Sequence, residues 1–361
     1  MNYKLIIWIN LILFFCGPLV AQNDSETRSY IKTLPVSKET SLEVTNKYGT
    51  VQITPWRKDS ALIRVEVKAS GASQEKLKKI FDGISIKITD SKLIIRAQTE
   101  FTQNINMLFE SFKGMTSKII SYDSKVEINY YINIPEYLNL NIENRYGDVY
   151  MENATGNFSA TISNGSFKAN SLSKGSDINL IFCDATINTF ISGRIDANFS
   201  EITIGESVDL TINSISSRID IKNAGLISTE SRRDKFYIGN IETLQGNSYF
   251  TDFRISNLKK EIDLISKYGS VNTDLIGKGF ESVDINSGYS DISLEFDPGC
   301  SYNIDIRHIN AFVVIPDKNS KTEKRALNEE KKEYMTFGTV GRNPGNTKVK
   351  IDATRGNIYL K

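Results

Sequence analysis

Three consecutive stretches of this chain read EITIGESVDLTINSISS (residues 201–217), RIDIKNAGLISTESRRD (218–234) and KFYIGNIETLQGNSYFT (235–251). Each is 17 residues long and opens with a charged residue followed by an apolar, a polar and an apolar residue. A fixed period in this range is typical of a solenoid, in which each repeat forms one coil.

The same step of 17 or 18 residues continues on both sides of these stretches. Three columns of positions between residues 149 and 276 are apolar at 22 of 24 places, although the whole chain is only 40% hydrophobic. The columns are Val149, Phe167, Ala185, Ile202, Ile219, Phe236, Phe253 and Val271; Met151, Ala169, Ile187, Ile204, Ile221, Ile238, Ile255 and Thr273; and Ala154, Leu172, Phe190, Ser207, Ala224, Ile241, Leu258 and Ile276.

Within one coil the pattern has period two, which predicts a strand buried on one side. The third column comes three residues after the second, so we expect the chain to bend there. Polar residues stack at this bend, and asparagine there tolerates left-handed backbone angles and forms ladders between adjacent coils. These residues are Asn153, Ser171, Thr189, Glu206, Asn223, Asn240 and Asn257.

Seventeen residues are too few for a strand–helix–strand crossover, so the coils must stack as parallel strands with a rise of about 4.8 Å. We therefore predict an all-β fold: a parallel β-solenoid (β-helix) with about 17–18 residues per coil and an N-terminal β-rich cap carrying one short helix. A β-sandwich is the alternative, but its hairpins vary in length and would not keep a fixed period.

The predicted domains are a signal peptide (1–21), an N-terminal cap and first coil (22–135), a β-solenoid (136–315), and a charged loop with a final coil (316–361). In the cap, Ser73 is the expected N-cap and Gly83 the end of a helix over 73–83, followed by a hairpin (84–88 and 93–97) with Asp90-Ser91 at its turn. The charged run 317–333 has balanced signs, which favours a solvated loop or short helix over a polyelectrolyte-binding arm.

Residues 1–21 read as an export signal, with a basic start, an apolar run and a helix-breaking Gly17-Pro18 before Ala21. The apolar run is short for a retained membrane anchor, so we expect no membrane span after cleavage. Cys183 and Cys300 then remain, and stacked coils would hold them too far apart for a disulfide.

Aromatic–glycine turns precede several coils, as in Asn46-Lys47-Tyr48-Gly49-Thr50-Val51, Asn144-Arg145-Tyr146-Gly147-Asp148-Val149 and Lys267-Tyr268-Gly269-Ser270-Val271. Glycine is expected to supply a positive φ at these corners. The aromatic residues form a partial column, which is either packing or an exposed platform for sugar rings. Its members are Tyr146, Phe182, Phe199, Phe250 and Tyr268.

Besides these turns, the chain contains Pro55-Trp56, and Gly338-Thr339-Val340-Gly341 followed by Lys348-Val349-Lys350-Ile351. In these features it resembles an exported adhesin family of Gram-negative bacteria, a domain of unknown function. The resemblance covers roughly residues 42–361 and implies a β-helix at the cell envelope. It brings no catalytic residues.

Catalytic signals are few. Asp184 and Glu201 occupy one column on adjacent coils, where they form either a pair for cleaving a polysaccharide or a solvated charge ladder. His308 is the only histidine, and we expect no histidine-based triad and no His-containing zinc site. We expect no metal and no cofactor, since the sequence has no P-loop, dinucleotide-binding turn or EF-hand loop. We expect no nucleic-acid partner, because Lys+Arg number 44 and Asp+Glu 43.

We therefore expect an exported non-enzymatic solenoid, in the periplasm or on the cell surface, that binds a cell-surface glycan or an envelope protein. The candidate binding residues are Tyr150, Tyr237 and Arg254 on the outward wall. The alternatives are a polysaccharide lyase or hydrolase using Asp184 and Glu201, and an assembly role in which coils stack end to end.

Overall fold

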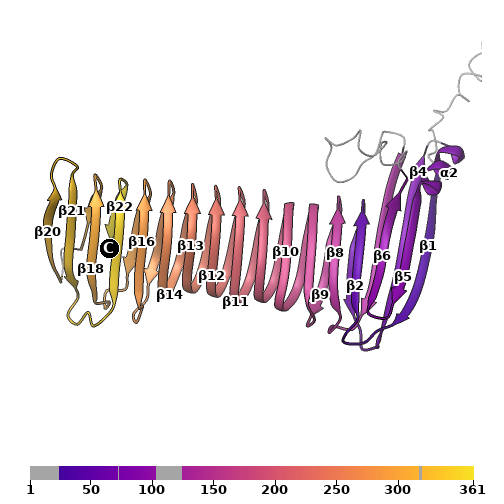
Figure 1. The fold of residues 1–361 in the computed structure, drawn as a ribbon, viewed down its shortest axis with the longest axis horizontal. Helices are drawn as coiled ribbons and strands as arrows, with labels where there is room; N and C mark the ends of the chain where they lie inside the picture. The colour runs from indigo at the N-terminus through magenta and orange to yellow at the C-terminus, as the bar shows by residue number, and fades with distance from the viewer. Residues whose placement is uncertain (1–23, 72, 103–123, 317–318) are drawn as a thin grey trace, which may run out of the picture.

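The computed structural model describes residues 24–71, 73–102, 124–316 and 319–361, and the predicted signal over 1–21 lies outside them. Within these ranges the chain is β-strand apart from one helix and the loops, so the all-β prediction is confirmed. The strands join in a 23-stranded sheet that extends along one long axis (Figure 1).

The middle of the chain is a stack of parallel rungs, each of which pairs with the next at a shift of 17 or 18 residues. In this register Ile202 lies beside Ile219, and Phe236 lies beside Phe253. The period predicted from the sequence is therefore equal to the residue shift between paired rungs of the sheet. The strands of this stack are β10 (Phe158–Asn198), β11 (Glu201–Ile215), β12 (Arg218–Arg232), β13 (Lys235–Tyr249) and β14 (Asp252–Lys267).

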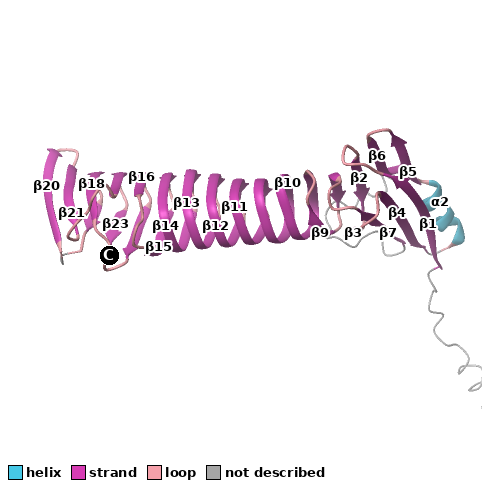
Figure 2. Ribbon diagram, turned by 90° about the horizontal axis from the view of Figure 1, so that it is seen from below, coloured by secondary structure: helices cyan, strands magenta, loops and turns pink. Residues whose placement is uncertain are grey.

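Each rung contributes to two walls, and Figure 2 shows the rungs as successive turns of one band. In β11 the first wall is 201–207, whose Ile202 and Ile204 point inward, and the second wall is 209–215, whose Leu210 and Ile212 point inward. Val208 lies between the walls at a gentle bend. The inward residues of both walls belong to one hydrophobic core. The three predicted columns follow the first wall and this bend, and the inward positions of the second wall were not predicted.

The predicted asparagine ladder exists at this bend. The Asn240 side chain donates to Asn223 at 2.8 Å, and the Asn257 side chain donates to Asn240 at 3.1 Å. These asparagines do not have a positive φ, so the expectation of left-handed angles at this bend is wrong. Because the bend is gentle, extended backbone suffices to turn it.

The N-terminal end continues both walls. β2 (Ser41–Lys47) and β3 (Val51–Pro55) pair in parallel with β8 (Asn139–Arg145) and β9 (Val149–Ala154), which confirms the predicted first coil. Beyond them, β6 (Ile94–Phe101) and β7 (Ser124–Ile134) are parallel additions. Antiparallel strands then finish the two walls: β5 (Ile84–Ser91), β4 (Ser60–Gly71) and β1 (Asp24–Pro35).

Helix α2 (Gln74–Asp82) lies against the antiparallel strands at this end. The Ser73 hydroxyl caps its start by accepting from the Lys76 N–H, and Leu77, Ile80 and Phe81 are buried. The predicted helix is confirmed. The hairpin that follows turns at Lys92-Leu93 and not at Asp90-Ser91, because β5 extends to Ser91. Strand β1 was not predicted.

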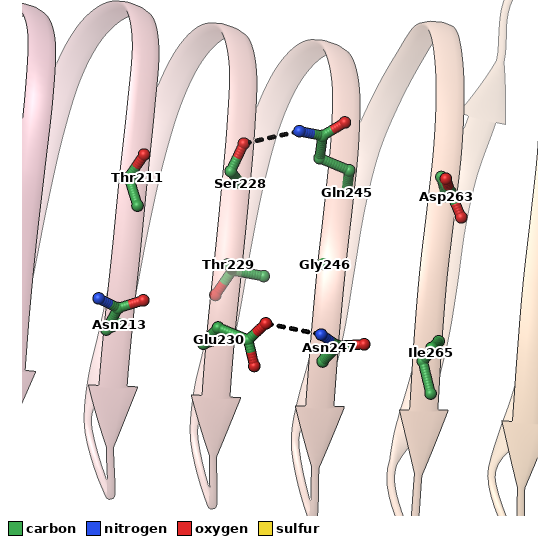
Figure 3. A pocket seen from close by; sticks show the side chains of 10 residues that line it. All are labelled: Thr211, Asn213, Ser228, Thr229, Glu230, Gln245, Gly246, Asn247, Asp263 and Ile265. Atoms are coloured by element: carbon green, nitrogen blue, oxygen red, sulfur yellow. Dashed lines mark hydrogen bonds between the residues drawn. The ribbon is translucent and has the colours of Figure 1, made fainter.

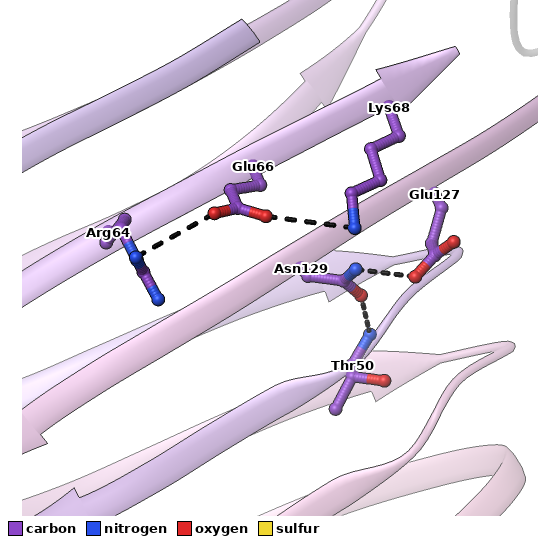
Figure 4. Close-up of polar contacts among 6 residues, drawn as sticks. All are labelled: Thr50, Arg64, Glu66, Lys68, Glu127 and Asn129. Carbon is purple, nitrogen blue, oxygen red and sulfur yellow. Dashed lines mark hydrogen bonds and ion pairs between the residues drawn. The ribbon is translucent and has the colours of Figure 1, made fainter. Parts of the chain in front are cut away.

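Polar contacts run along β4 and β7 at this end, and one of them joins β7 to the turn before β3 (Figure 4). Glu66 on β4 lies between Arg64 at 3.9 Å and Lys68 at 3.8 Å. On the neighbouring β7, the Asn129 side chain donates to Glu127 at 2.5 Å and accepts from the Thr50 N–H at 2.9 Å. The second contact fixes the turn before β3 against β7.

At the C-terminal end the order in space differs from the order in sequence. β22 (Lys348–Thr354) lies between β16 (Ser282–Gly288) and β18 (Tyr302–Ile309), and β23 (Asn357–Leu360) lies between β17 (Asp291–Phe296) and β19 (Phe312–Val314). The predicted final coil is thus inserted between two earlier coils. β15 (Ser270–Ile276) connects the regular stack to this region.

The charged run is not the predicted loop or short helix. Its described part forms β20 (Ser320–Asn328), which pairs antiparallel with β21 (Glu333–Val340), and β21 pairs with β18. Residues 321–327 on β20 are exposed. Charged side chains on an edge strand hinder pairing with another chain, which explains why this strand tolerates so much charge.

Candidate functional site

The three residues predicted to bind share one outward row of the first wall, but they do not gather in one place. Tyr237 and Arg254 are register partners on β13 and β14, whereas Tyr150 lies on β9, several rungs nearer the N-terminal end. The Arg218 guanidinium lies 4.2 Å from the centre of the Tyr237 ring and covers part of it. The exposed Arg254 has no ion pair with any described residue.

Tyr150 borders a separate, shallow hollow of about 350 Å³ together with Lys168 and Asn170. Its hydroxyl donates to the Asp148 carboxylate at 3.2 Å. Burial, and then the negative charge of Asp148, raises the pKa of Tyr150 above its usual value. The phenol is therefore a neutral group whose proton is already engaged.

The sharp corner between rungs is made by a residue with a left-handed backbone. Its φ lies between 49° and 66° along the whole stack. In spatial order the corner residues are Tyr48, Tyr146, Asn164, Phe182, Phe199, Ser216, Arg233, Phe250, Tyr268, Tyr289, Arg355 and Asn310. At most of these corners the N–H of the left-handed residue donates to a backbone carbonyl of the following rung. The Phe250 N–H, for example, donates to the Lys267 carbonyl at 2.8 Å.

The expectation that glycine supplies the positive φ is wrong, because the residue before the glycine does so. Gly147 and Gly269 are needed for a different reason. A Cβ at either position would collide with a backbone carbonyl oxygen of the preceding rung, that of Gly49 and that of Thr251 respectively. The turn therefore has a strained aromatic residue followed by a sterically required glycine.

The corner rings are stacked and exposed. Centroids lie 5.0 Å apart for Phe182 and Phe199, 5.0 Å for Phe250 and Tyr268, and 5.1 Å for Tyr268 and Tyr289. Phe182, Phe199 and Phe250 are each at least 50% exposed. At the far end of this run, the Arg355 guanidinium lies 5.0 Å from the centre of the Tyr289 ring.

The corner does not need a ring. Asn164, Ser216 and Asn310 adopt the same backbone with small side chains, and asparagine in this region is cheaper than a bulky residue. Strained backbone and exposed aromatic surface together have a cost in stability and solubility. The rings are consequently a surface property that folding alone does not explain.

A ladder of buried polar side chains holds the corner from inside. The Ser200 hydroxyl accepts from the Cys183 N–H at 3.1 Å, the Ser217 hydroxyl from the Ser200 N–H at 3.2 Å, and the Asp234 carboxylate from the Ser217 N–H at 2.6 Å. Asp234 is only 1% exposed, and burial raises its pKa although the Ser217 N–H opposes that rise. Each corner is thus fixed to the next by a side chain.

The second wall has a hollow of about 410 Å³ on β11 to β14 (Figure 3). Its floor lies at Gly246, which stands where the neighbouring rungs carry Thr229 and Leu264. The rim is polar, because two outward rows carry amides, hydroxyls and carboxylates. Its members are Thr211, Asn213, Ser228, Glu230, Gln245, Asn247 and Asp263, with Ile265 as an apolar neighbour.

Some of these rim groups already bond one another. The Gln245 amide donates to the Ser228 hydroxyl at 2.9 Å, and the Asn247 amide donates to the Glu230 carboxylate at 2.6 Å (Figure 3). The Asn213 amide donates to Asp196 on the preceding rung at 2.8 Å. The rim therefore presents preorganised acceptors and donors of the kind that bind hydroxyl groups.

Asp184 and Glu201 are register partners on β10 and β11, as predicted, and both are exposed. The next residue of their row is Arg218, which pairs with Asp220 at 2.8 Å. Neither carboxylate lines either of the two hollows described above. The row then continues with Arg218, Lys235 and Asp252, so that charges of both signs follow one another along it.

Cys183 and Cys300 are free and buried, as expected. The buried His308 packs against Tyr334, with ring centroids 5.6 Å apart. Among the described residues, no three His, Cys, Asp or Glu side chains gather in a way that suits a metal ion. No helix in the same part of the chain has the length and apolar character to span a membrane.

No family model matches the sequence, and no curated protein matches it. Solved structures do show a likeness to it. A candidate cell-adhesion protein from Clostridium sporogenes shares 12% identity over 93% of this chain and 100% of its own, with a TM-score of 0.20. A candidate adhesin from Parabacteroides distasonis shares 9% over 74% and 93%, with a TM-score of 0.34. Another from Bacteroides fragilis shares 10% over 93% and 97%, with a TM-score of 0.21.

These scores are too low to carry an argument about fold or function. The fold therefore rests on the strand register of this chain, and the candidate site rests on its corners and hollows.

Sequence reasoning missed the hollow and underrated the corner. The signal for the hollow is Gly246, a glycine at an inward position of the second wall, and the predicted columns do not include that wall. The signal for the strained corner is an aromatic residue directly before glycine, where the sequence places the positive φ on the glycine.

Proposed function

We propose that this chain is an exported β-solenoid that acts as an adhesin-like binding module of the cell envelope and works by contact, without catalysis. The parallel register at steps of 17 or 18 residues supports the solenoid, since each rung covers the edge of the preceding one. Export follows from the signal pattern of residues 1–21.

The observation that carries a binding role is the row of exposed aromatic corners. Bulky residues occupy left-handed backbone at Phe182, Phe199, Phe250 and Tyr268, although the same corner is built by serine or asparagine elsewhere. Exposed strained residues of this kind are typical of recognition surfaces. The outward row with Tyr237 and Arg254 is a second surface that the same partner would reach.

The test is retention of ligands by the chain without residues 1–21 on an array of glycans and on immobilised envelope proteins. We expect selective retention that falls when Phe250 and Tyr268 are both replaced by asparagine. A second variant replaces Tyr237 and Arg254 by serine and tests the outward row of the first wall separately. An array without any retained ligand contradicts a binding role.

The in-register pair Asp184 and Glu201 favours one alternative, a polysaccharide lyase or hydrolase. This alternative predicts new reducing ends, or new unsaturated ends, when the chain is incubated with the polysaccharides that it retains. Such products, lost in Asp184→Asn and kept in Asp209→Asn, would establish an enzyme and remove the non-catalytic proposal.

A further inference from the structure

The aromatic corner ladder has a gap in the middle of the stack. Phe182 and Phe199 form one stacked run, and Phe250, Tyr268 and Tyr289 form the other. Ser216 and Arg233 occupy the two corners between them. Three rung steps of about 4.8 Å separate the two runs, so the rings of Phe199 and Phe250 are about 14 Å apart from centre to centre.

The hollow of the second wall lies on the same rungs as this gap. Asn213 is on the rung of Ser216, Glu230 on the rung of Arg233, and Asn247 on the rung of Phe250. Each rim position lies three residues before its corner in the sequence. Two independent features, a missing ring and a missing inward side chain, thus coincide.

Positive charge is concentrated beside the gap. Arg232 and Arg233 are exposed neighbours at this corner, and neither makes an ion pair within the described residues. Lys235 follows two residues later and is also exposed, whereas the acidic Asp234 between them is buried. Glu230 is the nearest outward carboxylate on the strand, and it accepts from Asn247. An anionic group is the complement of this cluster.

We propose, building on the binding role above, that the gap takes one unit of an acidic polysaccharide. A pyranose ring at the level of Ser216 lies against the open face of Phe199, and its carboxylate or sulfate pairs with Arg233 and Arg232. The hydroxyls of the adjoining unit bond to Asn213, Glu230 and Asn247 in the hollow. The chain's near-zero net charge, +1, disfavours a polyphosphate partner, whose binding needs a broad basic field.

The gap offers a direct test, because Ser216→Phe adds the missing ring. Phe199 shows that the corner backbone accepts phenylalanine, so this variant fills the site with little effect on the fold. Ser216→Asn is the matched control, since Asn164 and Asn310 build the same corner. Arg233→Gln removes the charge, and Arg355→Gln removes a corner arginine outside the gap.

Binding is measured by calorimetry on the chain without residues 1–21, with oligomers of polygalacturonate, sulfated dextran, neutral dextran and single-stranded DNA. We expect binding of the carboxylated or sulfated sugar, weakened about tenfold or more by Ser216→Phe and by Arg233→Gln. Ser216→Asn and Arg355→Gln should stay within about twofold of the unsubstituted chain, and melting temperatures should report that all variants are folded.

Equal binding by Ser216→Phe and the unsubstituted chain would overturn this site and leave the binding role intact. So would retention of neutral glycans or envelope proteins only. Tighter binding of DNA than of either anionic sugar would replace the saccharide by a nucleic acid. No retention of any array member would remove the binding role itself.

Discussion

The regular stack, β11 to β14, and the C-terminal end, β16 to β23, use the same kind of rung in different orders. In the regular stack each rung lies beside its neighbours in sequence. At the C-terminal end the last coil lies between two coils that precede it in the chain. In both regions the rungs have buried apolar residues on the inside and a left-handed residue at the corner.

This difference teaches that the repeat specifies what a rung looks like, and not which rung it joins. A rung presents an apolar edge and unpaired backbone on each side, and any rung of matching shape satisfies them. In the regular stack the connection between successive rungs is so short that each rung can pair only with the next one in the sequence. At the C-terminal end the excursion through β20 and β21 lets the last coil enter a slot that is already flanked on both sides.

The largest expected effect comes from removing the last coil, residues 347–361. The coil at β18 and β19 would lose its parallel partner, and β16 and β17 would expose an edge. We expect a large fall in melting temperature, and association in size-exclusion chromatography because of the open edges. A synthetic peptide of residues 347–361 should restore much of the stability when added in trans.

The control for this deletion replaces residues 321–331 of the β20 hairpin with a short turn. β20 is an exposed edge strand, so its loss should cost much less. Equal damage from both changes would mean that the inserted coil has no special role. Soluble end-to-end association of the hairpin variant alone would support an assembly role that β20 blocks.

The second contrast compares two glycines. In the stack, a Cβ on Gly269 would collide with the Thr251 carbonyl, so Gly269→Ala forces two rungs apart. We expect a loss of several kcal/mol in the free energy of unfolding, in the range of disrupted core packing. At the C-terminal end, Gly345 has φ +55° with nothing within 4 Å of an added Cβ. Gly345→Ala should cost only about 1 kcal/mol of backbone strain.

Chemical denaturation of both variants measures this contrast. Equal costs for Gly269→Ala and Gly345→Ala would show that the stack relaxes around the added methyl group, and that close contact between rungs is not what requires glycine.

Asp234 makes the stability of the regular stack depend on pH. Burial raises its pKa, so the folded chain holds this proton more tightly than the unfolded chain. The resulting stability is complete below the usual aspartate pKa of about 3.9 and is lost as pH rises through the raised value. Asp234→Ser copies the Ser217 rung, and we expect it to stabilise the chain at pH 7 by about 1 kcal/mol. That gain should vanish near pH 4 in thermal melts.

His308 gives the opposite dependence at the C-terminal end. Burial, and then the positive charge of Lys324, lowers its pKa. The folded end therefore holds this proton less tightly, and stability is lost as pH falls below the usual histidine value of about 6.5. Amide protection factors, which correct for the intrinsic effect of pH on exchange, should fall more in β18 and β21 than in β12 between pH 7 and pH 5. A uniform change across both regions would contradict this assignment.

The sequence predicts the regular stack well, because burial repeats there at every coil. Ile202, Ile219 and Phe236 share a column in the chain and a column in the structure. The sequence does not predict that β22 is inserted between β16 and β18. The alternating pattern of β22 fits the edge of either strand equally well, so it does not specify the neighbours of β22. Nor does the sequence predict β1 or β20. Both are edge strands, so the alternation of apolar and polar residues is weak in β1 and is replaced by charged residues in β20. The aromatic residues of the corners are visible in the sequence, but the left-handed backbone of Tyr268 is not, because propensity assigns a positive φ to the following Gly269.

The smallest effect on stability is expected at the corner itself. Phe250→Asn keeps the left-handed backbone that asparagine favours, and it removes the stacking contact with Tyr268 at 5.0 Å. A stacked pair contributes about 0.5–1.5 kcal/mol, while relief of strain in a bulky residue offsets part of that. We therefore expect a change of less than about 1 kcal/mol in denaturation. Arg355→Asn, at the inserted coil, should likewise change little, because only its contact with the Tyr289 ring is lost. If Phe250→Asn instead unfolds the stack, the rings are structural and the corner cannot be a surface kept for binding. If neither Phe250→Asn nor Arg355→Asn changes the free energy of unfolding, folding does not require these corner side chains in either region. The aromatic corner residues are then retained for contacts with a binding partner.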